Sequence, residues 1–386
     1  MILRPYQEDA SAFLQNHIRA FVHAPAGSGK TVIGAHALSR VAHGNCFWLA
    51  NTQEQVDQAL HALNAFTPTH DVDLTVCCVA AQPDTSNADF IVFDEAHRTP
   101  ARTWKALADR APATARLWGL SATPWSADTE RNELLRNVFQ NFHQVNRAEL
   151  LAVGALEEGK AILWDLDEEG CFDEQIEANT QEEWQKIKGR FNYLRGEMFE
   201  AKEQEQLRYI RWRHTQDALR ASVNRNEFAC QKAAEEIANG QSVLVLVHAI
   251  EHGEQLTAAI PGSELVYSRI GAKKRRERIA AFKAGGLKCL IATSLADEGL
   301  DVPIASRLVL VAGGRSAGKV EQRAGRVLRP YAGKVGGIIH DFLDRGATLA
   351  NAQAWARMRT YEALGYQPEI RSAYRTSIEA NWKPTT

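Results

Sequence analysis

The sequence lacks the cysteine patterns that build zinc sites or disulfide frameworks. Its six cysteines are scattered, no Cys-x-x-Cys pair occurs, and no cysteine–histidine cluster has zinc-ligand spacing. Such usage is typical of reduced thiols, so a cytoplasmic protein is expected. The first residues, Met1 to Tyr6, do not have the pattern of a signal peptide.

Long apolar runs and an excess of one charge are also missing. The longest runs, such as Val243–Val247, are far shorter than the roughly 20 residues of a membrane span, so no membrane partner is expected. The net charge is −2, but residues 157–183 carry eleven acids against one lysine. Residues 269–288 carry eight bases against one acid. A near-neutral total therefore conceals a candidate basic face.

Short apolar runs alternate with helical periodicity in two stretches, roughly 1–150 and 225–345. The runs are Phe47–Ala50, Phe90–Phe93, Leu117–Leu120, Val243–Val247, Cys289–Ala292 and Leu308–Val311. Continuous apolar strands between helices predict parallel sheets covered on both faces. The expected fold class is α/β, with two tandem doubly wound domains.

The stretch between these domains has a different pattern. From Trp184 to Ala201 apolar residues recur at alternating spacings of three and four, which predicts one stripe of an amphipathic helix, weakened by Gly189 and Gly196. A second helical segment is expected from Leu207, and a hairpin is one form that this arm could take. The predicted division is a first domain at 1–150, a second at 155–167 and 224–345, and a helical arm at 168–223 inserted into the second. Residues 346–386 are expected to form a final helix, at about 347–364, and a tail. Ile162–Trp164 is expected to be a strand of the second sheet.

A glycine-rich turn follows the apolar segment Ala20–Val22 and precedes a helical stretch. It reads Pro25, Ala26, Gly27, Ser28, Gly29, Lys30, Thr31. A strand, a glycine turn and a helix N-terminus direct backbone N–H groups at a phosphate. Lys30 is expected to reach the terminal phosphates of ATP and Thr31 to ligate Mg²⁺. A chance Gly/Ser turn is the alternative, which the strand–helix context disfavours.

Two acids end the apolar strand around Ile91. Asp94 at its carboxyl end is expected to hold Mg²⁺, and Glu95 to orient or deprotonate the attacking water. Taken alone, an ordinary strand followed by an acidic turn explains the pattern equally well.

Asp94-Glu95-Ala96-His97 together with the glycine turn resembles the superfamily 2 helicases, whose fold is a pair of RecA-like domains, and five further segments match in order. They are the adenine-reading segment Leu3–Gln7, motif Ia at Asn51–Gln58, motif III at Ser121–Pro124, motif V at Ala292–Pro303 and motif VI at Gln322–Arg329. The matched segments span residues 3–329. In motif Ia the usual basic residue is Gln53 here, which puts that contact in doubt.

The resemblance implies roles for individual residues. The residues implied in catalysis are Lys30, Asp94, Glu95 and the arginine fingers Arg326 and Arg329. Those implied in nucleotide contacts, besides the glycine turn, are Arg4, Tyr6, Gln7, Gly299, Asp301 and Gln322. Those implied in coupling or nucleic-acid contacts are His97, Ser121, Thr123, Thr52 and Thr293. Arg326 and Arg329, three residues apart, share a helix face and lie far along the chain from Lys30. The site is therefore expected to be complete only when the two domains close. An exposed basic helix face is the alternative for these arginines.

The helicase group that the sequence resembles indicates whether the partner is DNA or RNA. Gly325–Pro330, followed by His340–Asp344, is most similar to XPB-type helicases, phage branch-migration helicases and type III restriction motor subunits, which act mainly on DNA. DNA is thus the expected partner, and RNA the less favoured one. Eighteen residues, Ile304 to Glu321, separate motifs V and VI, so a large strand-splitting hairpin does not fit between them.

Two basic segments could contact nucleic acid. In the arm, Lys186, Lys188, Arg190 and Arg195 interleave with Trp184, Phe191 and Tyr193, although burial of these aromatics is the simpler reading. Between Arg269 and Lys288 the basic residues suit either phosphate binding or a solvated helix face. The leading hypothesis is a monomeric ATP-dependent DNA helicase or branch-migration motor; the alternative is an ATP-switched DNA-binding subunit of a larger complex.

Overall fold

The computed structural model describes most of the chain. Its described residues are 2–66, 72–125, 128–156, 158–166, 170–191, 196–293, 300, 302–314, 320, 323–325, 327, 331, 334, 336–364 and 366–373. The chain divides into two compact units, which are treated separately below. The first comprises residues 1–157 and 321–330, and the second 158–320 and 331–386.

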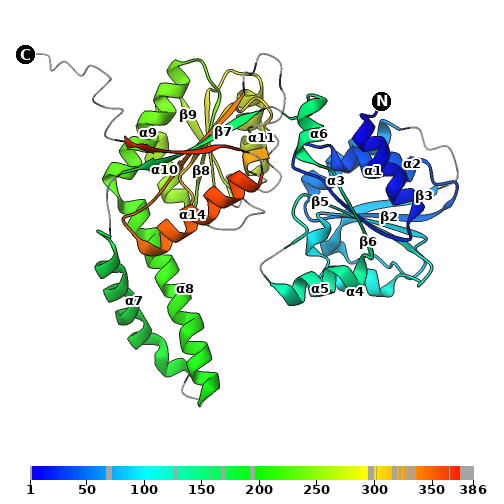
Figure 1. Ribbon diagram of the computed structural model, residues 1–386, viewed down its shortest axis with the longest axis horizontal. Coiled ribbons are helices and arrows are strands. Elements are labelled where there is room, and N and C mark those ends of the chain that lie inside the picture. Colours follow the sequence, from blue (N-terminus) through cyan, green and yellow to red (C-terminus); the bar gives the residue numbers. More distant parts are fainter. Residues whose placement is uncertain are drawn as a thin grey trace, which may run out of the picture. The chain divides into compact units, whose positions relative to one another are not determined.

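The first unit alternates strands and helices along the chain (Figure 1). Its strands are β1 (Arg19–His23), β2 (Gly44–Ala50), β3 (Val72–Cys78), β4 (Phe90–Asp94), β5 (Arg116–Ser121) and β6 (Asn141–Gln144). Its α-helices are α1 (Pro5–Asn16), α2 (Lys30–Ser39), α3 (Gln53–Asn64), α4 (Arg102–Arg110), α5 (Thr129–Val138) and α6 (Arg147–Ala152). Short 3₁₀ turns η1 (Val79–Ala81) and η2 (Ala96–Arg98) follow β3 and β4.

Six parallel strands form the sheet of this unit, in the order β3-β2-β4-β5-β1-β6. Phe21, Phe93 and Leu117 point to one face, where Trp104 of α4 and Leu135 of α5 pack on them. Helix α2 covers the opposite face so closely that a Cβ at Gly34 would lie 2.7 Å from Leu120 and 2.8 Å from Trp48. Both faces are buried, as a parallel sheet requires.

The second unit contains a second sheet and the longest helices. Its strands are β7 (Gly159–Asp165), β8 (Val243–Val247), β9 (Ser263–Val266), β10 (Cys289–Thr293), β11 (Arg307–Leu310), β12 (Gly337–Phe342) and β13 (Pro368–Ser372). Its helices are α7 (Asp173–Ile187), η3 (Lys188–Phe191), α8 (Glu197–Ala221), α9 (Val223–Ala238), α10 (Ile250–Ala259), α11 (Ala272–Lys283) and α14 (Thr348–Ala363).

All seven strands of this sheet are parallel, in the order β13-β7-β12-β11-β8-β10-β9. On one face Val245, Ile291 and Val309 pack with Phe228 of α9 and Leu256 of α10. The predicted α/β class with two RecA-like domains is confirmed. So are the six predicted strand runs, the last of which ends one residue early, and the strand at Ile162–Trp164, which is part of β7. The tail adds the strand β13, which the sequence reasoning missed.

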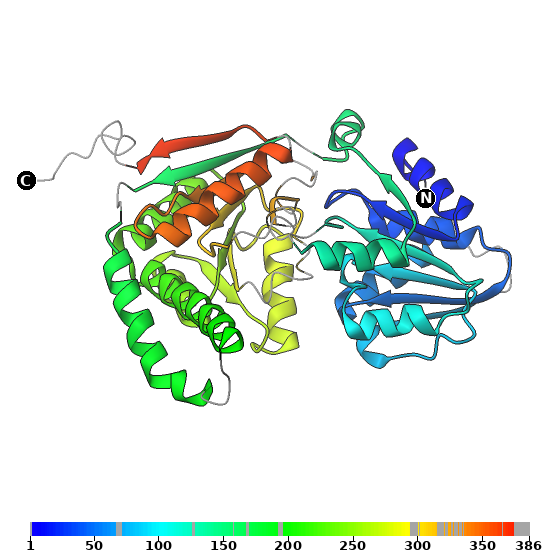
Figure 2. The same cartoon turned by 60° about the horizontal axis from the view of Figure 1, so that its bottom comes forward.

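The arm is a helical hairpin formed by α7 and α8, which pack on each other and project from the second unit (Figures 1 and 2). The predicted stripe from Trp184 to Ala201 does not lie on one helix, because α7 ends at Ile187 and α8 begins at Glu197, so the arm takes the hairpin form. Gly196 precedes α8 with φ 55°, a left-handed conformation that suits glycine. Met198, assigned to the apolar stripe, is exposed.

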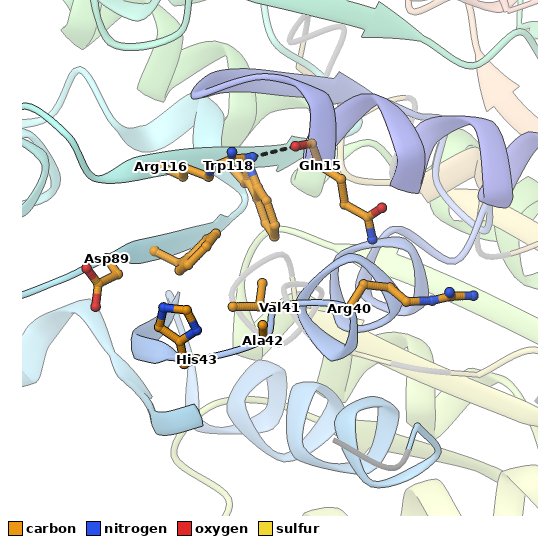
Figure 3. A pocket seen from close by; sticks show the side chains of 9 residues that line it. Gln15, Arg40, Val41, Ala42, His43, Asp89, Arg116 and Trp118 are labelled. Carbon is orange, nitrogen blue, oxygen red and sulfur yellow. Dashed lines mark hydrogen bonds between the residues drawn. The ribbon is translucent and has the colours of Figure 1, made fainter. Parts of the chain in front are cut away.

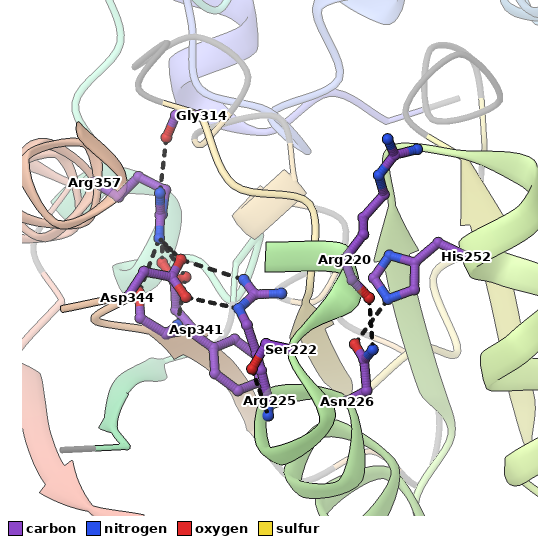
Figure 4. Close-up of polar contacts among 10 residues, drawn as sticks. Arg220, Ser222, Arg225, Asn226, His252, Gly314, Asp341, Asp344 and Arg357 are labelled. Atoms are coloured by element: carbon purple, nitrogen blue, oxygen red, sulfur yellow. Dashed lines mark hydrogen bonds and ion pairs between the residues drawn. The ribbon is translucent and has the colours of Figure 1, made fainter. Parts of the chain in front are cut away.

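Buried ion pairs tie the helices of the second unit to the end of β12 (Figure 4). The guanidinium of Arg357 donates to both carboxylate oxygens of Asp341, at 2.8 Å each, and to the Gly314 carbonyl at 2.9 Å. Arg225 of α9 donates from Nε to Asp344 at 2.7 Å. All four charged side chains are almost fully buried, so each depends on its partner for compensation.

Among the helices in the described part of the chain, none combines the length and apolar character that crossing a bilayer requires.

Arg357→Met should destabilise the protein by about 3–5 kcal/mol, because it leaves Asp341 buried without its partner. Arg359→Met, two residues along the same helix at an exposed position, should change stability by less than about 0.5 kcal/mol. Urea unfolding of the two variants measures the difference. Equal midpoints would contradict the role assigned to the ion pair.

Candidate active site

The turn between β1 and α2 has the geometry of a phosphate-binding loop. Gly27 and Gly29 have φ values of 89° and 79°, in the left-handed region. A Cβ at Gly29 would lie 2.6 Å from the Nε2 atom of Gln7, so only glycine fits this position. As the N-cap of α2, Gly29 has no side chain to occupy the first backbone N–H groups of the helix, among them those of Lys30 and Thr31. These groups are placed to bind an anion.

Helix α1 holds this loop from outside. The hydroxyl of Tyr6 donates to the Ser28 carbonyl at 2.8 Å, and Nε2 of Gln7 donates to the same oxygen at 3.0 Å. Oε1 of Gln7 accepts from the backbone N–H of Arg4 at 3.1 Å. Burial raises the pKa of Tyr6, which keeps the phenol a donor. The structure therefore gives Tyr6 and Gln7 a loop-anchoring role that sequence reasoning missed, and the adenine contact of Gln7 stays a prediction.

The two acids follow β4 directly. Burial, and secondarily the neighbouring Glu95, raise the pKa of Asp94 to about 7, while Lys30 opposes the shift. Burial also disfavours the charged form of Glu95, but His97, Lys30 and Arg98 outweigh it and lower the pKa of Glu95. At pH 7 Glu95 is therefore ionised, while Asp94 is protonated in about half of the molecules.

These residues fit a divalent cation and a nucleotide. Oγ of Ser28 is buried without a hydrogen-bond partner among the described residues, and the buried Oε2 of Glu95 has His97 Nδ1 near it at 3.2 Å. No group of three or more metal-ligating side chains occurs in that part of the chain. Mg²⁺ is commonly held by one or two protein oxygens together with phosphate oxygens, so a site of this composition suits Mg²⁺ with ATP. Asp94 and Thr31 are the residues that would hold the cation.

Three of the predicted coupling residues meet at Ser121, the last residue of β5. Its hydroxyl lies 2.9 Å from Nδ1 of His97 and accepts from the Thr123 backbone N–H at 3.1 Å. Its carbonyl accepts from the Ala24 N–H at 3.0 Å, at the start of the phosphate loop. His97 Nδ1 also lies 3.2 Å from Oε2 of Glu95. The acid turn, the Ser121 segment and the phosphate loop are thus linked directly.

Sequence reasoning missed two cations near this network. Arg98 favours the ionised form of Glu95, and Arg131 of α5 donates to the His97 carbonyl at 3.2 Å. Arg98 lies inside the recognised acid turn, but Arg131 comes from a helix that no motif marks.

The remaining predicted site residues are placed less completely. Thr52 caps α3, its hydroxyl accepting from the Gln55 N–H at 3.3 Å. Thr293 is buried at the carboxyl end of β10. Five predicted residues lie outside the described part of the chain: Gly299, Asp301, Gln322, Arg326 and Arg329.

A pocket of about 390 Å³ opens at the opposite, amino-terminal edge of the first sheet (Figure 3). Trp118 and Phe90 contribute its apolar lining, and Arg40 and Arg116 its cationic groups. None of the predicted nucleotide-site residues lines it.

Asp94→Asn should stabilise the protein above pH 7 by about 4 kcal/mol in the absence of nucleotide and Mg²⁺. Between the ordinary aspartate pKa of 3.8 and pH 7, folded Asp94 retains a proton that the unfolded chain has released. The wild-type free energy of unfolding therefore falls as the pH rises from about 4 to 7. The variant does not lose this stability, because asparagine does not ionise.

Urea unfolding at pH 5 and pH 8 in chelator measures the difference. The gain should be larger at pH 8, while Asp109→Asn, at an exposed position, should show no such pH dependence. A gain that is the same at both pH values would contradict the raised pKa of Asp94.

Two family models match the chain. The helicase conserved C-terminal domain matches residues 225–331, and the type III restriction enzyme res subunit matches 1–79 and 79–126. A putative helicase 22 of Sulfolobus islandicus filamentous virus (isolate Iceland/Hveragerdi) is 29% identical over 275 residues, which cover 67% of this chain and 43% of the viral protein. The putative DNA 3'-5' helicase Rad25 of Halobacterium salinarum is 25% identical over 362 residues, covering 85% and 52%. The chain thus spans about half the length of these relatives.

Solved structures share the fold. An ATP-dependent Type ISP restriction-modification enzyme, LlaBIII, bound to DNA, has a TM-score of 0.62 at 14% identity and covers 97% of this chain and 32% of its own. Dbp5 of S. cerevisiae, bound to RNA and ADP BeF3, has a TM-score of 0.59 at 14% identity and covers 97% and 91%. The Pyrococcus furiosus Hef helicase domain has a TM-score of 0.54 at 16% identity and covers 92% and 98%.

Proposed function

Because the chain belongs to the superfamily 2 helicases, we propose that it is an ATP-dependent DNA motor that couples nucleotide hydrolysis to unwinding, branch migration or translocation. The observation that carries the proposal is the buried acid pair beside the phosphate loop. Asp94 and Glu95 share the carboxyl edge of the first sheet with Lys30, close enough for its charge to shift both carboxyl pKa values. The archaeal relative is named as a putative DNA helicase, which favours DNA as the polymer.

The chemistry divides among the chain's own residues. Lys30 and the first N–H groups of α2 would bind the phosphates, while Thr31 and Asp94 would hold Mg²⁺, which neutralises phosphate charge when bound. Glu95, with its lowered pKa, is ionised at neutral pH and can accept a proton from the attacking water. Arg326 and Arg329 are proposed to stabilise charge developing on the transferring phosphoryl group.

A movement of Asp94 and Glu95 would be transmitted to the proposed nucleic-acid contacts through the hydrogen bonds of Ser121. Its hydroxyl contacts His97, two residues after Glu95, and its carbonyl contacts the phosphate loop. We propose that His97, Ser121 and Thr123 relay the state of the nucleotide to the nucleic-acid contacts. Thr52 and Thr293 are proposed as such contacts, made through backbone phosphates.

Lys30→Ala and Glu95→Gln should each lower DNA-stimulated ATP turnover by at least about a hundredfold, because the first removes the phosphate-binding cation and the second the proton acceptor. Glu95→Gln should keep most of its ATP affinity, whereas Lys30→Ala should lose it. Steady-state phosphate release with and without DNA, and equilibrium nucleotide binding, separate the two effects. Arg326→Ala should lower turnover more than nucleotide affinity.

The matched control is Lys105→Ala on α4, whose partner Asp109 lies on the same exposed helix face. It should leave turnover unchanged. Full DNA-stimulated turnover in Lys30→Ala would exclude this nucleotide site.

A second candidate is an ATP-switched motor that tracks duplex DNA without separating its strands. The eighteen residues from Ile304 to Glu321 favour it, because they are too few for a large strand-splitting hairpin. A strand-displacement assay beside a triplex-displacement assay distinguishes the two. Displacement of a third strand without release of a duplex strand would select the second candidate.

A further inference from the structure

Two arm aromatics that the sequence offered for base stacking, Trp184 and Phe191, instead pack on each other, and a third, Tyr193, lies outside the described residues. Trp184 is buried between α7 and α8, where Nε1 donates to Glu203 at 2.8 Å. Its ring stacks on Phe191 with centroids 5.8 Å apart and also contacts Phe199. These rings hold the two helices of the hairpin together, so Trp184 does not stack on bases.

A different pair of aromatic rings lies at the surface of α8. Tyr209 is 56% exposed and Trp212 is 37% exposed, and their ring centroids are 6.3 Å apart. They are three residues apart, so they share one face of the helix. Tyr209 and Trp212 are called the α8 aromatic pair below.

Contacts with α7 fix the orientation of this face. Ile210, His214 and Glu203 lie on the side of α8 that meets α7: Ile210 is buried, and His214 bonds Glu183 of α7 at 3.0 Å. Arg211 adds an ion pair to Glu177 of α7 at 2.7 Å. By helical geometry the α8 aromatic pair then faces away from α7.

The pair lies beside a predicted nucleic-acid contact. The Trp212 ring meets the His248 ring edge-on, with centroids 6.3 Å apart. His248 directly follows β8, whose last residue Val247 is the register partner of Thr293 in β10. Thr293 is the residue of the second unit proposed to contact the nucleic-acid backbone. The α8 aromatic pair thus lies next to the carboxyl ends of β8 and β10, where nucleic acid is expected to bind.

A cation accompanies the rings. Arg208 is exposed on the same side of α8, donates to the Gln204 carbonyl at 3.1 Å, and forms no ion pair with any residue that the structure describes. The nearest acid on this face, Glu205, is paired with Lys202 at 2.7 Å. An exposed arginine beside two exposed aromatic rings offers a phosphate contact and a stacking surface together.

We propose that the α8 aromatic pair is a stacking platform for the bases of single-stranded DNA, with Arg208 contacting the adjoining phosphate. The inference rests on the proposed DNA-motor function and extends it to the arm. Single-stranded DNA is favoured over duplex because base faces are accessible only when unstacked. It is favoured over a protein ligand because the surface contacts His248, beside the strand end that carries Thr293, and includes the exposed Arg208.

Equilibrium binding to two strands of equal length tests the platform. One is a fluorescent oligothymidylate, and the other has abasic sites in its central stretch. Wild type should bind the intact strand about tenfold or more tightly than the abasic strand, because stacking contributes only when bases are present. Tyr209→Ala/Trp212→Ala should bind both strands with the affinity of wild type for the abasic one.

Controls separate stacking from folding and from general binding. Trp355→Ala removes a ring that is 38% exposed on a different helix, α14, and should keep the wild-type preference. Trp212→Phe should retain most of it. ATP turnover without DNA should be unchanged in the double variant. If the double variant loses stability, Tyr209→Ala alone provides the test, with an intermediate loss expected.

The outcomes are distinct. A double variant that keeps the wild-type preference overturns the platform, as it would if the rings bound a protein partner instead. An equal loss on both strands also overturns it, since stacking cannot act where bases are missing. A wild type whose ATP turnover responds to no nucleic acid overturns the motor function itself, and the platform with it.

Discussion

Two neighbouring carboxylates buried at the end of β4 are the constraint on which the rest of the first unit depends. Two like charges that have lost their water cannot both ionise cheaply, and the pKa of Asp94, raised to about 7, expresses that cost. The surroundings compensate Glu95 alone, through His97, Lys30 and Arg98. The proposed Mg²⁺ with its phosphate oxygens would compensate the remaining charge, so binding of Mg²⁺ and a nucleotide would stabilise the pair.

The fold brings the compensating groups to this point by strand register. Strands β1, β4 and β5 are adjacent and parallel, so their carboxyl ends place the phosphate loop, the acids and Ser121 at one edge of the sheet. Helix α1 then fixes the loop through Tyr6 and Gln7. The same device recurs in the second unit, where β8 and β10 end together beside the base of the arm. Each unit thus presents residues proposed to be functional on the carboxyl edge of a parallel sheet.

The two parallel sheets could be predicted from the sequence because strands that are buried on both faces consist of continuous runs of apolar residues. Strands without such runs were not predicted. Half-buried and exposed residues alternate in the first part of β3, and β13 lies at the sheet edge with largely accessible side chains. The arm was recognised, with a hairpin as one reading, but the position of the break between its helices was not, because the apolar spacing continues across Gly196. Motif residues were located by resemblance, whereas Arg131 and the exposed rings of α8 depend on tertiary placement. No local pattern distinguishes Trp184, which is buried, from Trp212, which is not.

The central claim is that the acid pair and the phosphate loop form one site for ATP with Mg²⁺. Its most direct test is the affinity for a non-hydrolysable ATP analogue, measured with Mg²⁺ and with chelator in wild type and Asp94→Asn. We predict that Mg²⁺ tightens binding to wild type by about tenfold or more and that the variant loses most of this dependence. Identical wild-type affinities in Mg²⁺ and in chelator would contradict the account.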